Sequence, residues 1–111
     1  MKEAIKMITI LCRMKVKAER DDEFVNIVRM LSNRVPTECE GCINYIWLRD
    51  SDDPSRFALL EQWSSRGAVY AYLDWLKAIL GPPKEGRFDF LPAKIIDLLE
   101  DLEIKHHDVV K

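Results

Sequence analysis

The chain has few of the features that mark membrane, secreted or nucleic-acid-binding proteins. Its 111 residues contain no apolar run of the roughly 18 residues that a membrane-spanning helix needs. The formal net charge is −2 and no basic patch stands out, which argues against nucleic acid as a partner. Residues 1–6 lack the long apolar core of a signal peptide. We therefore expect a cytoplasmic protein that binds neither nucleic acid nor membrane.

Cysteine is also scarce. The chain has three, an odd number that does not indicate a disulfide framework. Cys39 and Cys42 form a C-x-x-C motif, but the motif follows a predicted helix and leads into a strand, whereas redox motifs of this kind open a helix. A zinc site needs more ligands than this pair supplies. We expect no metal and no other cofactor.

The length fits one domain that spans residues 1–111. Apolar residues make up 48% of the chain, enough for a core. A chain below about 150 residues buries a smaller share of its surface, and association between copies often makes up the difference. No repeat, low-complexity segment or linker divides the sequence.

The order of predicted elements points to one fold. Alternating apolar residues predict strands at 7–17, 42–50, 56–63 and 103–110. Helical spacing predicts helices at 19–35, from Ser64 or Ser65 to about Leu80, and after Pro92, where Ile95, Leu98, Leu99 and Leu102 share a face. Gly41 is the expected left-handed stop of the first helix, and Gly81-Pro82-Pro83 ends the second.

The resulting order, β-α-β-β-α-(α)-β, is that of the ferredoxin-like, split β-α-β fold of the α+β class. In this fold a four-stranded antiparallel sheet carries both long helices on one face. The predicted strand 42–50 is apolar on both faces, so the open face should be covered as well. A second copy in a two-fold homodimer is the commonest solution.

The segment 57–68 is the most informative part of the chain. Glu61 and Trp63 stand two residues apart on a predicted strand and therefore share a face. An ionised carboxylate is costly to bury unless it is paired, so a carboxylate beside an indole suggests the floor of a pocket. The alternative is that Glu61 pairs near a strand end and Trp63 simply packs in the core.

Several pieces of sequence occur in a recognisable order. They are Ile8-Thr9-Ile10, the acidic helix start 20–24, Glu40-Gly41-Cys42-Ile43-x-Tyr45, Asp53-Pro54, Phe57-x-x-x-Glu61-x-Trp63 and Ala68. Together they resemble the antibiotic biosynthesis monooxygenase family of dimeric α/β barrels, over about residues 7–110. The resemblance implies a ferredoxin-like fold, a homodimer whose sheets close into a barrel, and a pocket between sheet and helices in each subunit.

The resemblance also implies an activity, the oxidation of a small phenolic or quinol-type aromatic by molecular oxygen without metal or flavin. The substrate supplies the electrons, so the protein needs only to bind the ring, help remove a phenolic proton and keep the anion dry. The candidate catalytic residues are Trp63 as ring platform, with Tyr72 and Arg87 holding the oxyanion. Glu61 and Phe88 are candidate substrate-binding residues, and Phe88 with Arg87 lies in a loop, 82–90, that is either a lid or a subunit contact.

Tyr72 departs from the family's pattern, because many members carry a histidine nine residues after the strand tryptophan. Tyrosine, with a pKa of about 10, is a poor base at neutral pH but can donate a hydrogen bond. Haem-degrading relatives need that histidine as an iron ligand and an asparagine on the first strand. This chain has neither, which argues against haem degradation. Two alternatives stay open: a non-catalytic dimeric module that binds a small hydrophobic ligand, and an isomerase of small carbonyl compounds, which an aromatic pocket disfavours.

His106 and His107 complete the candidate substrate-binding residues. They are adjacent on the last predicted strand, so they point to opposite faces and cannot easily share one metal. One of them should face the helices, where a side chain of free pKa near 6.5 can serve as the base in place of the absent histidine. The alternative is a terminal strand with solvated or interface histidines, and the sequence does not determine which one faces inward.

Overall fold

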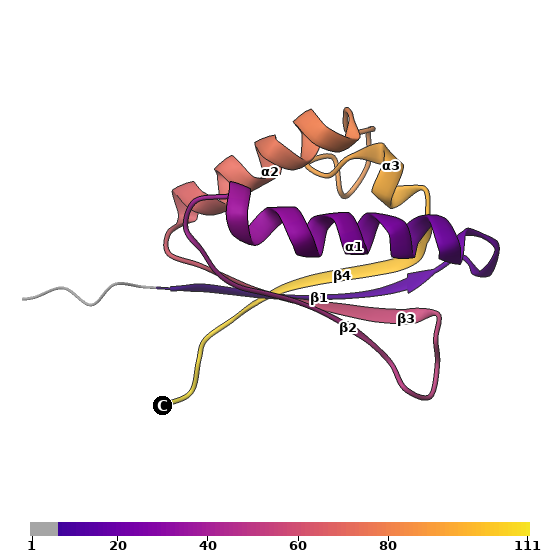
Figure 1. Ribbon diagram of the computed structural model, residues 1–111, viewed down its shortest axis with the longest axis horizontal. Coiled ribbons are helices and arrows are strands. Elements are labelled where there is room, and N and C mark those ends of the chain that lie inside the picture. The colour runs from indigo at the N-terminus through magenta and orange to yellow at the C-terminus, as the bar shows by residue number, and fades with distance from the viewer. Residues whose placement is uncertain (1–6) are drawn as a thin grey trace, which may run out of the picture.

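The computed structural model describes residues 7–111, and the expectation made for residues 1–6 lies outside this range. The elements are β1 (Ile8–Val16), a short 3₁₀ helix η1 (Ala18–Arg20), α1 (Asp21–Glu38), β2 (Cys42–Arg49), β3 (Arg56–Trp63), α2 (Arg66–Leu80), α3 (Ala93–Ile96) and β4 (Leu99–His107). All the helices lie on one side of the sheet (Figure 1). The expected ferredoxin-like α+β fold is therefore confirmed.

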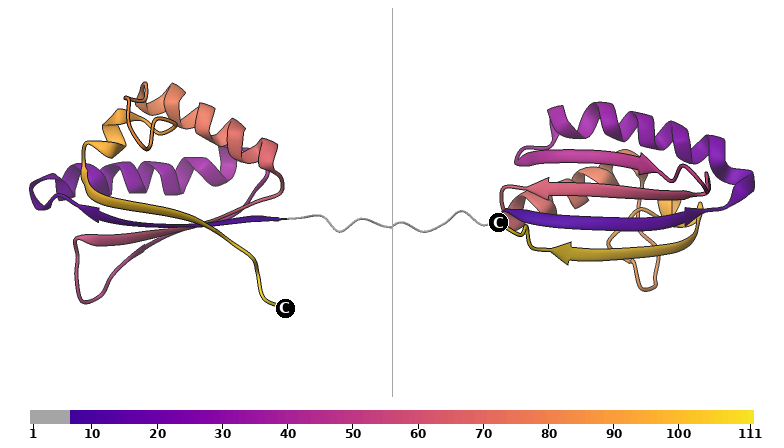
Figure 2. Two further views of the ribbon diagram at one scale, coloured as in Figure 1. Left: turned by 180° about the vertical axis from the view of Figure 1, so that it is seen from behind. Right: turned by 90° about the horizontal axis from the view of Figure 1, so that it is seen from below.

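The sheet is antiparallel throughout and has the strand order β2-β3-β1-β4. Seen from below, its second face carries no helix (Figure 2). The sheet is open, with β2 and β4 at its edges, so a single chain does not form a closed barrel. None of the helices within residues 7–111 is long and apolar enough to cross a membrane.

The core follows from the two periodicities of the sequence. Alternate residues of β1, from Ile10 to Val16, are buried against the helices. The buried stripe of α1 consists of Phe24, Ile27, Leu31 and Val35. The apolar face of β1 and the apolar stripe of α1 face each other, so the sheet and the helix layer bury a common core between them.

Gly41 brings the start of β2 against the start of α2. Its φ of +86° is in the left-handed region that glycine tolerates. Gly41 is not the stop of α1, however, because that helix ends at Glu38 with an extended C-cap at Cys39, and Gly41 lies in the turn that leads into β2. A Cβ at this position would lie 2.6 Å from the Cβ of Ala68 and 2.8 Å from the Oγ of Ser64. The Ser65 hydroxyl caps α2 by accepting a 3.1 Å hydrogen bond from the Ala68 N–H. These contacts fix the first turn of α2 over one end of the sheet.

The C-terminal segment differs from the prediction. The expected helix after Pro92 is only one turn long, and the strand begins at Leu99 instead of residue 103. The cause is the pairing of β4 with β1, whose register runs from Val16 opposite Leu99 to Thr9 opposite His107. Tertiary pairing along the whole of β1 overrides a short helical pattern, and it places Leu102 on the helix-facing side of a strand, where it is buried.

Candidate active site

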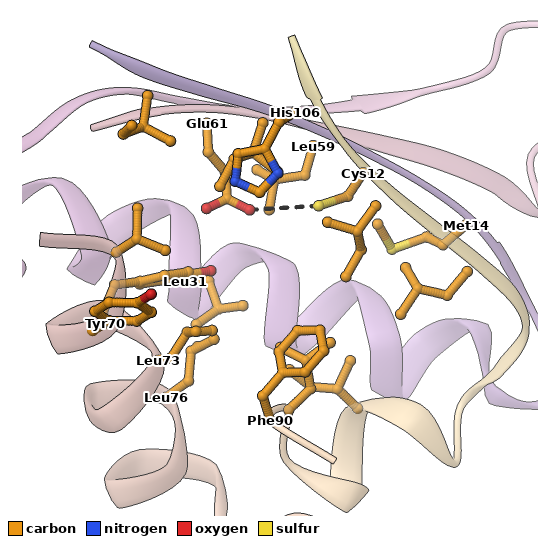
Figure 3. Close-up of a pocket in the computed structure, with 18 of the residues that line it drawn as sticks. Cys12, Met14, Leu31, Leu59, Glu61, Tyr70, Leu73, Leu76, Phe90 and His106 are labelled. Atoms are coloured by element: carbon orange, nitrogen blue, oxygen red, sulfur yellow. Dashed lines mark hydrogen bonds between the residues drawn. The ribbon is translucent and has the colours of Figure 1, made fainter. Parts of the chain in front are cut away.

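A cavity of about 420 Å³ lies between the sheet and α2, α3 and the loop that joins them. Its walls are mostly apolar. Figure 3 shows Cys12, Glu61 and His106 projecting from the sheet toward this space, opposite Tyr70, Leu73 and Leu76 of α2. Apolar walls with a few polar groups are the usual composition of a small-molecule site.

The pairing of the strands determines which polar side chains the sheet presents to the cavity. Tyr45, Glu61, Ile10 and His106 are paired in that order across the four strands, so they form one row on the helix-facing side. Glu61 and His106 therefore flank Ile10, with their strands about 10 Å apart. His106 lines the cavity, whereas His107 is paired with Thr9 on the other face. The register thus shows which of the two histidines faces the helices.

Glu61 is the buried carboxyl of the cavity, with 5% of its surface exposed. Its Oε1 accepts a 2.9 Å hydrogen bond from the indole Nε1 of Trp63, and its Oε2 accepts a 3.5 Å hydrogen bond from the Cys12 thiol. Burial raises the pKa of Glu61 above its ordinary value, and the two hydrogen bonds offset this only in part. Glu61 is therefore a stronger base than an exposed glutamate.

Tyr72 is linked to the row of Glu61 through Tyr45, whose Cα is paired with that of Glu61. Its hydroxyl and that of Tyr45 are hydrogen-bonded at 2.9 Å. Burial raises the pKa of Tyr72 well above its usual range, so the group stays a protonated hydroxyl at any ordinary pH. In this hydrogen bond one hydroxyl donates its proton and the other accepts it, so the proton of the accepting hydroxyl has no partner within the pair. When Tyr45 donates, the proton of Tyr72, which lines the cavity, is free for a ligand.

Trp63 is fully buried and lies outside the cavity lining. Its ring packs on that of Tyr72, with centroids 4.7 Å apart and planes tilted by 33°. The aromatic surface that the cavity presents here belongs to Tyr72, and Trp63 supports it from behind. Trp63 therefore reaches the cavity only through Tyr72 and through its hydrogen bond to Glu61.

Arg87 and Phe88 also lie outside the lining. The Arg87 guanidinium sits over the Phe88 ring, 5.2 Å from its centroid, and Phe88 packs edge-on against Phe90. It is Phe90 that closes the cavity from this loop. The cation at the cavity is instead Arg66, the first residue of α2, which the sequence analysis missed. The sequence did offer a signal for Arg66, because it lies three residues after Trp63, where the chain passes from strand to helix.

The three cysteines and the possible metal ligands do not form a further reactive site in the part of the chain that the structure describes. Cys12, Cys39 and Cys42 are all free thiols. Burial raises the pKa of Cys39 to about 11, so it is not a reactive thiolate at neutral pH. No group of three or more His, Cys, Asp or Glu within residues 7–111 is arranged to hold a metal ion.

Solved structures share this fold. A conserved protein from Methanosarcina mazei is 22% identical, with a TM-score of 0.70 over 93% of this chain and 92% of that one. Protein PA3566 of Pseudomonas aeruginosa is 17% identical, with a TM-score of 0.75 over 98% and 100%. An antibiotic biosynthesis monooxygenase is 18% identical, with a TM-score of 0.69 over 94% and 99%. A search of curated proteins found no match.

The fold and the cavity define a ferredoxin-like α+β protein with a small-molecule site between sheet and helices. The sequence model of the antibiotic biosynthesis monooxygenase family matches residues 7–75, more than half of the chain. The chain therefore belongs to that family, as the sequence motifs indicated. The matched range includes Glu61 and Tyr72 and ends before Phe90 and His106.

Proposed function

We propose that the protein is a cofactor-independent monooxygenase that oxidises a phenolic or quinol-type aromatic with molecular oxygen inside the cavity. The observation that carries this proposal is that Glu61, a buried carboxyl with a raised pKa, and Tyr72, a buried hydroxyl that stays protonated, both line one apolar cavity. Membership of the monooxygenase family supports the reaction class.

The size of the cavity limits the substrate. A cavity of about 150 Å³ holds one benzene ring, so about 420 Å³ has room for two or three fused rings. Apolar walls from Ile10, Leu73 and Leu76 suit the faces of such a ring system. They disfavour the isomerisation of a small polar carbonyl compound, which needs more hydrogen-bonding groups than this lining offers.

Glu61 and Tyr72 divide the acid–base work. The Glu61 carboxylate accepts the phenolic proton, because its raised pKa brings its basicity closer to neutral pH. Tyr72 keeps its own proton and donates a hydrogen bond to the phenolate oxygen. In this scheme Trp63 is a positioning residue, since it holds the Glu61 carboxylate through Oε1.

The overall reaction balances without a further reductant. A phenol with a free para position and one O₂ give a quinone and one water. The phenolate passes one electron to O₂, the phenoxyl radical and superoxide combine at the para carbon, and the proton held by Glu61 returns to the peroxide. Loss of water then leaves the second oxygen on the ring as a carbonyl. The ring supplies all four electrons that O₂ takes up.

We further propose that the protein works as a homodimer in the cytoplasm. The helix-free face of the sheet exposes Ile46 and Leu48, 44% and 53% accessible, as apolar surface that a second copy would cover. The family resemblance implies that two such sheets close into a barrel. Free thiols at all three cysteines support a reducing compartment.

A second candidate function is a non-catalytic module that binds the same class of aromatic. The observation in its favour is that both oxygens of Glu61 already accept hydrogen bonds from the protein. A carboxylate held in this way could act purely as an acceptor for a bound hydroxyl group.

Oxygen consumption distinguishes the two functions. The measurement uses chelator-treated protein with 1-naphthol, anthrone and naphthoquinol, and compares Glu61→Gln with Glu103→Gln, an exposed glutamate of β4. We expect uptake of one O₂ per quinone formed from the phenol or anthrone, a fall of about 10²-fold or more in Glu61→Gln, and no change in Glu103→Gln. No uptake, or full activity in a folded Glu61→Gln protein, would refute the catalytic assignment.

A further inference from the structure

Two side chains that can carry positive charge line the cavity at one end of the sheet. Strands β3 and β4 both run antiparallel to β1, so they are parallel to each other and finish at the same end. Arg66 begins α2 just after β3, and His106 is the last residue but one of β4. Both line the cavity and both are exposed to solvent. They therefore mark its mouth, whereas Glu61 is buried inside.

Arg66 is available to a ligand. Its side chain forms no ion pair or hydrogen bond with another residue in the part of the chain that the structure describes. Arg20, Arg34 and Arg49, in contrast, each pair with a carboxylate. A guanidinium is charged at every ordinary pH, and its planar fork matches the two oxygens of a carboxylate.

The interior sets the direction in which an amphipathic ligand enters. An ionised group would lose its hydration among the apolar walls and would approach the acidic Glu61. The same group at the mouth keeps solvent and meets Arg66. A ligand with an acidic end and a phenolic end therefore has one favourable orientation, with its ring over Ile10, between His106 and Glu61 in the row across the sheet.

We propose that the substrate is an aromatic carboxylic acid whose carboxylate binds Arg66 at the cavity mouth, with His106 beside it, while the phenolic end reaches Glu61. This inference rests on the proposed function and narrows its substrate class. It also gives the reaction a regiochemistry, because the acid group fixes which ring position lies beside Glu61 and Tyr72.

The test is a binding measurement that needs no turnover. Calorimetry compares anthraquinone-2-carboxylate with the uncharged anthraquinone-2-carboxamide, on the wild type, Arg66→Gln, Arg66→Lys and Arg87→Gln. Arg87 is the matched control, an arginine outside the cavity. We expect the wild type and Arg87→Gln to prefer the carboxylate by about tenfold or more, Arg66→Gln to lose the preference, and Arg66→Lys to keep part of it.

The outcomes separate this inference from the proposed function. Equal affinity of the wild type for both ligands, or a preference that survives in Arg66→Gln, would overturn the carboxylate site alone. No binding of either ligand would overturn both, because the cavity would then not be a site for fused aromatic rings. Circular dichroism of each variant confirms that the exposed substitutions leave the fold intact.

Discussion

The indole Nε1 of Trp63 donates a 2.9 Å hydrogen bond to Oε1 of Glu61, two residues earlier on the same face of β3. This bond couples a fully buried side chain to the cavity without a contact between that side chain and a ligand. It partly offsets the rise that burial causes in the pKa of Glu61, since a donor to a carboxylate favours the charged form.

Trp63→Phe should therefore move the pH dependence of catalysis. Without the indole N–H the pKa of Glu61 rises further, so the acid limb of the kcat/KM profile shifts to higher pH. The comparison is Trp75→Phe, which removes an indole N–H bonded to the exposed Glu38 outside the cavity and should leave the profile in place. An acid limb that stays fixed or moves down in Trp63→Phe would show that Trp63 does not tune Glu61.

Glu61→Gln should stabilise the fold in a pH-dependent way. The pKa of Glu61 is higher in the folded protein than the value of about 4.3 in an unfolded chain. The stabilising contribution of protonated Glu61 is fully present below the unfolded pKa and is lost as the pH rises through the folded pKa. Glutamine avoids the charge and still accepts a hydrogen bond from Trp63.

Calorimetric melting at pH 4, 6 and 8 measures this effect. We expect the Tm of Glu61→Gln to exceed that of the wild type at pH 8, and the gain to shrink toward pH 4. A gain that grows toward acid would mean that the folded protein lowers the pKa of Glu61. Gain of stability with loss of activity is the usual signature of a strained functional group.

The fold was predictable because its signals are local and repeated. Alternation in β1 and the apolar stripe of α1 specify which faces are buried before any partner is known. Gly41 marked the turn correctly because few other residues tolerate its φ. The C-terminal segment was less predictable, since Leu98, Leu99 and Leu102 fit a helix locally, and only pairing with β1 makes the last two part of a strand.

The site was only partly predictable, for a related reason. That Glu61 and Trp63 share a face follows from the strand period alone. The choice between His106 and His107 needed the register of β4 against β1, which is a tertiary property. The sequence analysis named Arg87 and missed Arg66, because the position of Arg87 depends on the path of the loop after α2, in which Arg87 packs on Phe88 and Phe90 lines the cavity.

Tyr72→Phe and Tyr45→Phe form a matched pair. Each removes the same hydroxyl–hydroxyl hydrogen bond and leaves one buried hydroxyl unpaired, so each should cost about 1–3 kcal/mol of stability. Of the two, Tyr72 lines the cavity and Tyr45 does not. We expect Tyr72→Phe to lower the oxygenation rate by about tenfold to a hundredfold, with a much smaller effect of Tyr45→Phe. Equal rate losses would assign the effect to the damaged pair and not to a bond with the substrate.

The helix-free face of the sheet offers a test of the proposed dimer. Leu48→Glu places a charge on apolar surface that is 53% exposed, and should convert a dimer into a monomer in analytical ultracentrifugation. Val109→Glu, at a residue with 48% exposure beyond the end of β4, is the control and should stay dimeric. A wild type that sediments as a monomer, or a dimeric Leu48→Glu protein, would show that this face does not form the interface.

Gly41→Ala should be among the most damaging single substitutions outside the core. The left-handed φ of +86° costs an alanine about 1–2 kcal/mol. Its Cβ would also stand 2.6 Å from the Cβ of Ala68, a clash that requires the start of α2 to move and adds about 1–3 kcal/mol. The expected fall in the free energy of unfolding, measured with urea, is therefore about 2–5 kcal/mol.

A double-mutant cycle separates the two causes. Ala68→Gly removes the atom that the new Cβ would strike, at a cost of about 1 kcal/mol in a helix. If the clash is real, Gly41→Ala with Ala68→Gly loses less stability than the sum of the single changes. Simple additivity would instead assign the loss to backbone strain and to the 2.8 Å approach of the new Cβ to the Oγ of Ser64, which Ala68→Gly leaves in place. Because α2 carries Arg66 and Tyr72, the same cycle run on oxygen consumption shows whether the approach of β2 to α2 also sets the geometry of the cavity.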